Sequence, residues 1–152
     1  MNHILTIREL QDIDQFYGKA DPVLREARKY VESFDWDWAV RRSQEALELS
    51  IKSIFRFIRK DYPKDHDLEK HLYEIAKKLK EYDVTAEEVA LMVLANATLT
   101  LWRLPAFYGD EKLHIGKLFS EKEARLALWY AERVHSMCYR VRDRLYRSAP
   151  HG

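Results

Sequence analysis

The chain has 152 residues, of which 34 % are charged and 47 % hydrophobic, and its 26 basic and 25 acidic side chains give a net charge of +1. This length is enough for one domain whose core needs neither disulfides nor metals. The balanced charge excludes overall electrostatic attraction as the means of binding nucleic acid or an anionic membrane. Cys138 has no partner cysteine in the sequence, which indicates a reducing compartment.

No apolar stretch is long enough for a signal peptide or a membrane span, so a cytoplasmic protein is expected. Abundant Lys, Glu and Arg with few Asn and Gln suggest a thermophilic source. Strand patterns, repeats and low-complexity tracts are absent from the sequence. We therefore expect a single helical domain over residues 1–152, with an N-terminal extension at 1–20 and a disordered tail at 148–152.

Two short segments are predicted at the start of the chain. The apolar spacing of residues 4–16 approximates that of a helix, so a short helix or an arm held against the domain is expected there. Gly18 with the Asp21-Pro22 pair predicts that this segment stops there. Pro22 suits the first turn of a second helix, capped by Asp21 and running to about Ser33.

A long amphipathic helix is predicted from Asp35 to the region of Pro63. Small residues recur along it at spacings of three and four, beside a row of bulky residues. The small residues are Ala39, Ser43, Ala46, Ser50 and Ser53, and the bulky ones are Val40, Leu47, Ile51, Ile54 and Ile58. A row of small residues lets a neighbouring helix approach closely, and the bulky row fills the core beside it. Glu48 and Lys52 lie one helical turn apart on the same helix.

Two helices are predicted in the middle of the chain. The first spans residues 68–82 and follows an aspartate cap. The second begins with a capping box of Thr85 and Glu88 and ends before Pro105. Apolar residues occupy nearly every face of this second helix, which predicts that it is the central and most buried one.

The final helix is predicted from a capping box of Ser120 and Glu123 to about Tyr146. Its first half is rich in small residues, so we expect it to pack closely against the small-residue row of the long helix. Together these elements predict an all-α fold, an antiparallel bundle of about five helices joined mostly by short loops.

Three segments, taken in order and spacing, carry a resemblance to a known family. They are AVRRSQEALELSIK at residues 39–52, HDL at 66–68, and LFSEKEARLALWYAERV at 118–134, with Arg103 between the last two. This arrangement resembles the HEPN (higher eukaryotes and prokaryotes nucleotide-binding) domain family in its stand-alone archaeal and bacterial form. The resemblance covers about residues 23–147.

The resemblance implies a helical bundle with a four-helix core, commonly a homodimer and often the partner of a small nucleotidyltransferase. Many members of the family are RNA-cleaving toxins or defence components. In those members an Arg followed after four to six residues by a His forms a metal-independent site at the dimer interface. A base there activates the ribose 2′-hydroxyl, and the Arg stabilises the charge that develops on the phosphate.

This chain departs from the ribonuclease pattern at one position. Arg103 stands where the family has its Arg, but Tyr108 follows after four intervening residues in place of the His. A tyrosine, with a pKa near 10, is a poor general base at neutral pH. The remaining candidates for a catalytic base are His66, just before a predicted helix, and His114, in the irregular segment after Pro105.

The candidate site residues also have simple structural explanations. Glu48 and Lys52 could form an exposed i, i+4 ion pair or line a polar groove. Arg103 could complement the dipole at the end of a helix or contact a phosphate, and Tyr108 could anchor a loop. The sequence contains no HExxH pattern and no repeated ExxH pair, so neither a metal nor another cofactor is predicted.

Three functions remain compatible with these residues. We favour a dimeric HEPN-like binding or interaction module, linked to a nucleotidyltransferase or to an RNA-related toxin or defence system, without robust catalysis. The second is a ribonuclease that uses Arg103 with His66 or His114. The third is a nucleotide-binding protein whose groove contains Glu48, Lys52 and Arg103.

Overall fold

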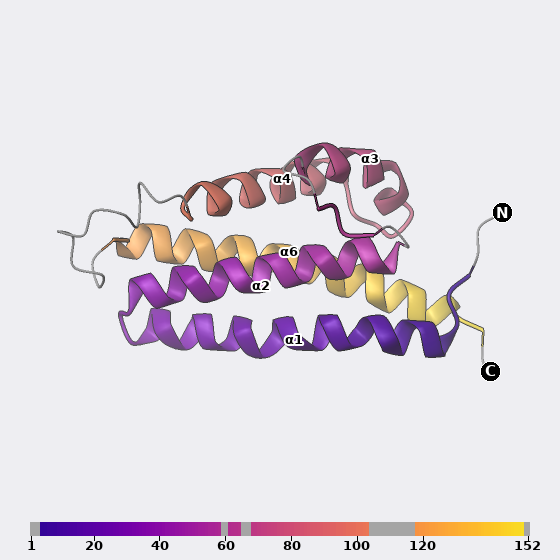
Figure 1. Cartoon of the computed structure of the whole chain (residues 1–152), viewed down its shortest axis with the longest axis horizontal. Helices are drawn as coiled ribbons and strands as arrows, with labels where there is room; N and C mark the ends of the chain where they lie inside the picture. The colour runs from indigo at the N-terminus through magenta and orange to yellow at the C-terminus, as the bar shows by residue number, and fades with distance from the viewer. Residues whose placement is uncertain (1–3, 59–60, 65–67, 104–117, 151–152) are drawn as a thin grey trace.

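Five helices account for most of the described residues in the computed structural model, which covers residues 4–58, 61–64, 68–103 and 118–150 (Figure 1). They are α1 (Ile7–Glu32), α2 (Trp36–Phe57), α3 (Leu68–Lys80), α4 (Ala86–Leu101) and α6 (Glu121–Ser148). No strand occurs in these ranges, which confirms the predicted all-α bundle. Within the same ranges, no helix combines the length and apolar character needed to span a bilayer.

The helices form an elongated layer of α1, α2 and α6, with α3 and α4 lying over one side of it (Figure 1). α1 runs antiparallel to both α2 and α6, whereas α2 and α6 run in the same direction. At one end of this pair Asp37 of α2 accepts a hydrogen bond from the N–H of Phe119, and further along Ser53 lies beside Cys138. α2 and α6 are therefore parallel, because α4 runs back toward the end where α2 began.

α1 continues through Gly18 and Pro22, where the sequence predicts a break. Pro22 cannot donate a hydrogen bond to the carbonyl of Gly18, four residues earlier. Gly18 is exposed, so water can bond to that carbonyl in place of the missing donor. Buried residues on both sides of Pro22 pack along one face and hold the two halves on a common axis; they are Leu10, Ala20, Leu24, Ala27 and Val31.

α2 is the central helix, and the prediction that α4 would be the most buried helix is wrong. Thirteen of the 22 residues of α2 are buried, against four of the 16 residues of α4. Leu94 and Leu101 of α4 are 53 % and 51 % exposed, because no described helix covers that side of α4.

The two small-residue rows are completely buried, and α2 packs far more extensively against α1 and α6 than against α4. This confirms the predicted close contact between the long helix and the final helix. The fully buried small residues of the two helices are Ala39, Ser43, Ala46, Ser50, Ser53, Ala124, Ala127 and Ala131.

Capping boxes begin three of the helices, and each satisfies backbone N–H groups that the helix itself leaves without partners. They pair Thr6 with Glu9, Thr85 with Glu88 and Ser120 with Glu123. The second and third boxes confirm the predicted starts of α4 and α6, and the first sets the start of α1.

Candidate functional site

A pocket of about 180 Å³ opens where α2, α3 and α4 meet. Leucine side chains from all three helices form its apolar wall, and its polar residues are Gln44, Glu48, Tyr62, Glu69, Asn96, Thr100 and Arg103. Two hydrogen bonds hold the walls in place. The side-chain amide of Gln44 donates to the carbonyl of Leu99 at 3.0 Å, and that of Asn96 donates to Glu69 at 3.0 Å.

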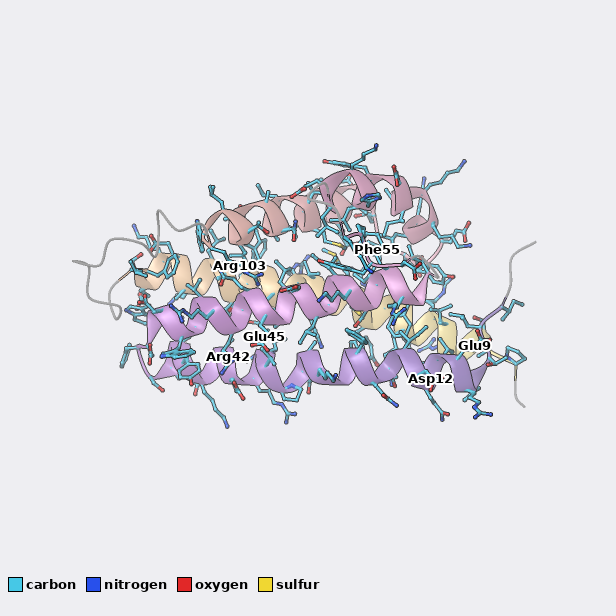
Figure 2. The ribbon with its side chains drawn as sticks, viewed as in Figure 1. Glu9, Asp12, Arg42, Glu45, Phe55 and Arg103 are labelled. Carbon is cyan, nitrogen blue, oxygen red and sulfur yellow. The ribbon has the colours of Figure 1, made fainter. Side chains whose placement is uncertain are left out.

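Glu48 lies between two cations at the mouth of this pocket. The Nη1 atom of Arg103 is 3.1 Å from Oε2 of Glu48, and the Nζ atom of Lys52 is 3.3 Å from Oε1 of the same carboxylate. Figure 2 shows Arg103 beside α2, just beyond the end of α4. The ring of Trp102 packs at 5.5 Å from that of Phe119, which fixes the point where the chain leaves α4 and places Arg103 over α2.

The charges in the pocket keep Glu48 ionised. Partial burial alone would raise the pKa of Glu48, but the guanidinium of Arg103 and then the ammonium of Lys52 outweigh burial, so this pKa lies below its ordinary value. Burial raises the pKa of Tyr62, and the negative charge of Glu48 raises it further. At neutral pH the mouth of the pocket therefore holds the ionised Glu48 between two cations, beside a protonated Tyr62.

The three charged side chains remain accessible to solvent. Arg103 is 43 % exposed, and Glu48 and Lys52 are each about one third exposed. Ion pairs exposed to this extent contribute only about 0–1 kcal/mol. An incoming anion can therefore replace Glu48 as the partner of Arg103 at small cost.

The structure brings together three of the residues predicted for the site, Glu48, Lys52 and Arg103. The other three candidates, His66, Tyr108 and His114, lie outside the described residues.

The described residues include two further histidines, His71 and His135, and neither lines the pocket. His71 pairs with Glu74 on α3 at 3.2 Å, and His135 stacks on Tyr17 between α1 and α6. Across the described ranges, no group of three or more His, Cys, Asp or Glu side chains is arranged to hold a metal ion.

Sequence reasoning missed five polar residues of the pocket: Gln44, Tyr62, Glu69, Asn96 and Thr100. Two of them carry a signal that could have been read. Gln44 is four residues before Glu48 and so lies on the same face of α2. Asn96 is the only amide in the otherwise apolar or small-residue stretch of α4 that follows Glu88.

The sequence profile of the HEPN domain matches residues 13–142, which is most of the chain and runs from the first half of α1 to the last turns of α6. The chain therefore belongs to the HEPN domain family, as its all-helical fold and the order and spacing of its sequence segments lead one to expect. Neither a curated protein nor a solved structure matches the chain.

Proposed function

We propose that this protein is a HEPN-type binding module that holds RNA or a nucleotide by its phosphate at the Arg103 pocket, without robust catalysis. One observation carries the proposal: Arg103 and Lys52 converge on a single carboxylate, Glu48, at an accessible pocket mouth. Together Arg103, Lys52 and Glu48 have a net charge of +1, and both cations can contact a single bound anion.

A phosphate suits this arrangement better than a carboxylate of the protein does. The guanidinium of Arg103 offers a planar fork of donors that matches two phosphate oxygens, and Lys52 adds a point charge. The polar walls supply the side chain of Asn96 and the hydroxyl of Thr100 for the rest of a nucleotide. Glu48 would then separate from Arg103 and keep its pair with Lys52.

The titration of the pocket argues against efficient cleavage. Transfer of a proton from a ribose hydroxyl needs a base whose pKa lies near the working pH. Glu48 has a pKa below its ordinary value and is a weak base, and Tyr62, with its raised pKa, stays protonated. The described part of the pocket thus provides charge stabilisation without a matched base.

Membership of the HEPN family further supports a homodimer and a nucleotidyltransferase partner, as the resemblance implies. We propose both as the setting in which the pocket acts. Sedimentation of the purified chain tests the first, since a strict monomer at working concentration would contradict it. Co-purification with a nucleotidyltransferase encoded beside it tests the second.

Fluorescence anisotropy with a labelled single-stranded RNA tests the binding site. Arg103→Ala should weaken binding about tenfold, the size of one lost charge-assisted contact of about 1.4 kcal/mol. Glu48→Gln should strengthen binding, because it removes the carboxylate that competes with phosphate. Arg125→Ala is the matched control, since Arg125 is an exposed arginine paired with Glu121 at the start of α6.

Equal affinities for the wild type, Arg103→Ala and Arg125→Ala would overturn the proposed site. Incubation of the same RNA with each variant tests catalysis. Cleavage that is lost in both Arg103→Ala and His66→Ala, or in both Arg103→Ala and His114→Ala, would establish the ribonuclease alternative instead.

A further inference from the structure

A second pocket, of about 380 Å³, lies next to the Arg103 pocket on the same side of α2. The two pockets share Tyr62, and Lys52 links them because it lines the second pocket while its ammonium contacts Glu48 of the first. The second pocket is lined by Phe16, Lys52, Arg56, Asp61, Tyr62 and Lys64.

The cations of the two pockets form a row along α2. Glu48, Lys52 and Arg56 are spaced by four residues and therefore lie on one face of the helix. At 1.5 Å per residue, Arg56 is about 12 Å along the axis from Glu48, where the guanidinium of Arg103 sits. This spacing along the helix is longer than a single phosphate group, and a single-stranded oligonucleotide of a few nucleotides can span it.

The charges of the second pocket are not balanced within the described part of the chain. Arg56 is exposed and Lys64 borders the same pocket, and neither forms an ion pair with a described carboxylate. Lys52 lines the pocket too but pairs with Glu48, so Arg56 and Lys64 oppose one carboxylate in the lining, Asp61. This excess of positive charge favours an anion.

Two aromatic rings accompany these cations. The guanidinium carbon of Arg56 lies 5.7 Å from the centre of the Phe16 ring, and the ammonium of Lys52 lies 5.1 Å from the centre of the Tyr62 ring. Basic groups interleaved with aromatic rings are the combination that binds single-stranded nucleic acid, since the cations contact phosphates and the rings stack on bases.

We infer that the second pocket is a nucleotide subsite, so that the two pockets together bind a single-stranded oligonucleotide in preference to a mononucleotide. Arg56 and Lys64 bind a phosphate one or more nucleotides away from the one at Arg103, and Phe16 and Tyr62 offer stacking surfaces. This inference rests on the proposed function of the Arg103 pocket.

The bound oligonucleotide does not extend past Arg56 into the third pocket of this surface. A third pocket, of about 520 Å³, borders the second and is lined by Glu9, Asp12 and Asp61 together with Arg56. Its three carboxylates repel a phosphate backbone. Figure 2 shows Glu9 and Asp12 on the N-terminal part of α1, toward the opposite end of the molecule from Arg42 of α2. The phosphate path therefore ends at Arg56.

Anisotropy titrations with labelled oligouridylates of two, four and eight nucleotides, and competition with uridine monophosphate, test the subsite. The double variant Arg56→Ala/Lys64→Ala should bind the four- and eight-nucleotide strands about tenfold more weakly, as expected for lost charge-assisted contacts. Uridine monophosphate should bind the double variant with the same affinity as the wild type. The slope of log affinity against log salt should fall by roughly 0.7 for each phosphate contact removed.

Two further variants complete the experiment. Arg133→Ala is the matched control, because that guanidinium also lies over an aromatic ring, 5.9 Å from the centre of Trp129 on α6, away from the pockets. It should bind every strand as the wild type does. Phe16→Ala should weaken binding of the oligouridylates but not of inorganic polyphosphate, which has the charge without the bases.

The outcomes separate the two proposals. If the double variant binds the eight-nucleotide RNA with wild-type affinity while Arg103→Ala binds it more weakly, the subsite is overturned and the proposed function stands. Unchanged binding in Arg103→Ala would overturn the proposed function and the joined site with it.

Discussion

Arg142 near the end of α6 binds Asp14 in the first half of α1, with its Nη2 atom 2.7 Å from Oδ2 of the carboxylate. The hydroxyl of Tyr146 donates to the same oxygen at 3.1 Å. The guanidinium of Arg142 also lies over the rings of Tyr17 and Tyr146, at 5.2 Å and 4.7 Å from their centres. This cluster joins two helix ends that are 128 residues apart in the sequence.

Replacing Asp14 by Asn should lower the free energy of unfolding by about 1–3 kcal/mol, because it removes a carboxylate that accepts hydrogen bonds from a cation and a hydroxyl. Urea unfolding of the wild type and the variant measures this. Asp12→Asn is the control, since Asp12 is exposed on the same helix and should change stability by no more than about 0.5 kcal/mol. Equal losses in the two variants would contradict the role of the cluster.

The Asp14–Arg142 pair also predicts part of the loss of stability at low pH. The hydrogen bond from Arg142 holds the pKa of Asp14 below its ordinary value of 3.8. A lowered folded pKa means that the stabilisation is complete above the pKa of the unfolded chain and is lost as pH falls through the folded pKa. Asp14→Asn should therefore unfold with a shallower loss of stability below about pH 4 than the wild type. If the wild type and Asp14→Asn lose stability equally below pH 4, other carboxylates dominate the acid denaturation.

Asp37, in the first turn of α2, holds the chain at the entry to α6. Its buried carboxylate accepts hydrogen bonds from the N–H groups of Leu118 at 3.3 Å and Phe119 at 2.9 Å. Asp37→Ala leaves two N–H groups with no acceptor and should cost about 2–3 kcal/mol. Asp35→Ala, which removes a neighbouring acid that makes no side-chain cap hydrogen bond, should cost much less in the same thermal or urea experiment.

Local signals account for most of what could be predicted about the fold. The capping box at Thr85 gives the first residue of α4, and the buried small row that begins at Ala39 predicts the contact between α2 and α6. The direction of α6 could not be predicted, because a row of small residues packs equally well against either orientation. The continuity of α1 through Pro22 also escaped prediction, since packing on both sides outweighs the one lost hydrogen bond.

The candidate site was only partly visible in the sequence. The i, i+4 spacing identifies Glu48 and Lys52 as a pair, and the family resemblance singles out Arg103. Their convergence depends on how α4 ends over α2, across 55 residues of sequence, and no periodicity encodes that. Tyr62 enters the pocket from the segment after α2, and its position is likewise set by tertiary packing.

Phe34 occupies a backbone conformation that normally belongs to glycine. Its φ is 61°, and it follows the end of α1, where the N–H of Asp35 bonds to the carbonyl of Tyr30 at 2.8 Å. The ring is 72 % exposed. The left-handed conformation costs a bulky residue about 1–2 kcal/mol, partly offset by the greater freedom of glycine when unfolded. Phe34→Gly should therefore raise the free energy of unfolding by about 0.5–1 kcal/mol.

Asp83 provides the comparison for this prediction because its φ is 63°. Aspartate tolerates the left-handed region better than phenylalanine, and the Asp83 carboxylate also pairs with Arg144 at 2.5 Å. In parallel thermal melts, Asp83→Gly should therefore raise the melting temperature less than Phe34→Gly does, or lower it. A melting temperature that is lowered by Phe34→Gly would show that the contact of the phenyl ring with Trp36 matters more than the backbone strain.

His135 predicts a second pH-dependent transition, nearer to neutrality. Its ring stacks on Tyr17 at 5.0 Å between centres, and its Nε2 is 3.9 Å from the carboxylate of Asp21, with no hydrogen-bond partner among the described residues. Burial lowers the pKa of His135 below its ordinary value of 6.5, and the attraction of Asp21 only partly opposes this. The folded chain therefore holds His135 neutral in the pH range where the unfolded chain would protonate it.

Because the folded pKa is the lower one, this stabilisation is complete above the unfolded pKa of about 6.5 and is lost as pH falls through it toward the folded pKa. His135→Phe keeps a ring to stack on Tyr17 and removes the titration, so its free energy of unfolding should stay flat between about pH 7 and pH 5. The wild type should lose stability over that range. Parallel slopes for the wild type and His135→Phe would show that the burial of this imidazole does not set the pH dependence.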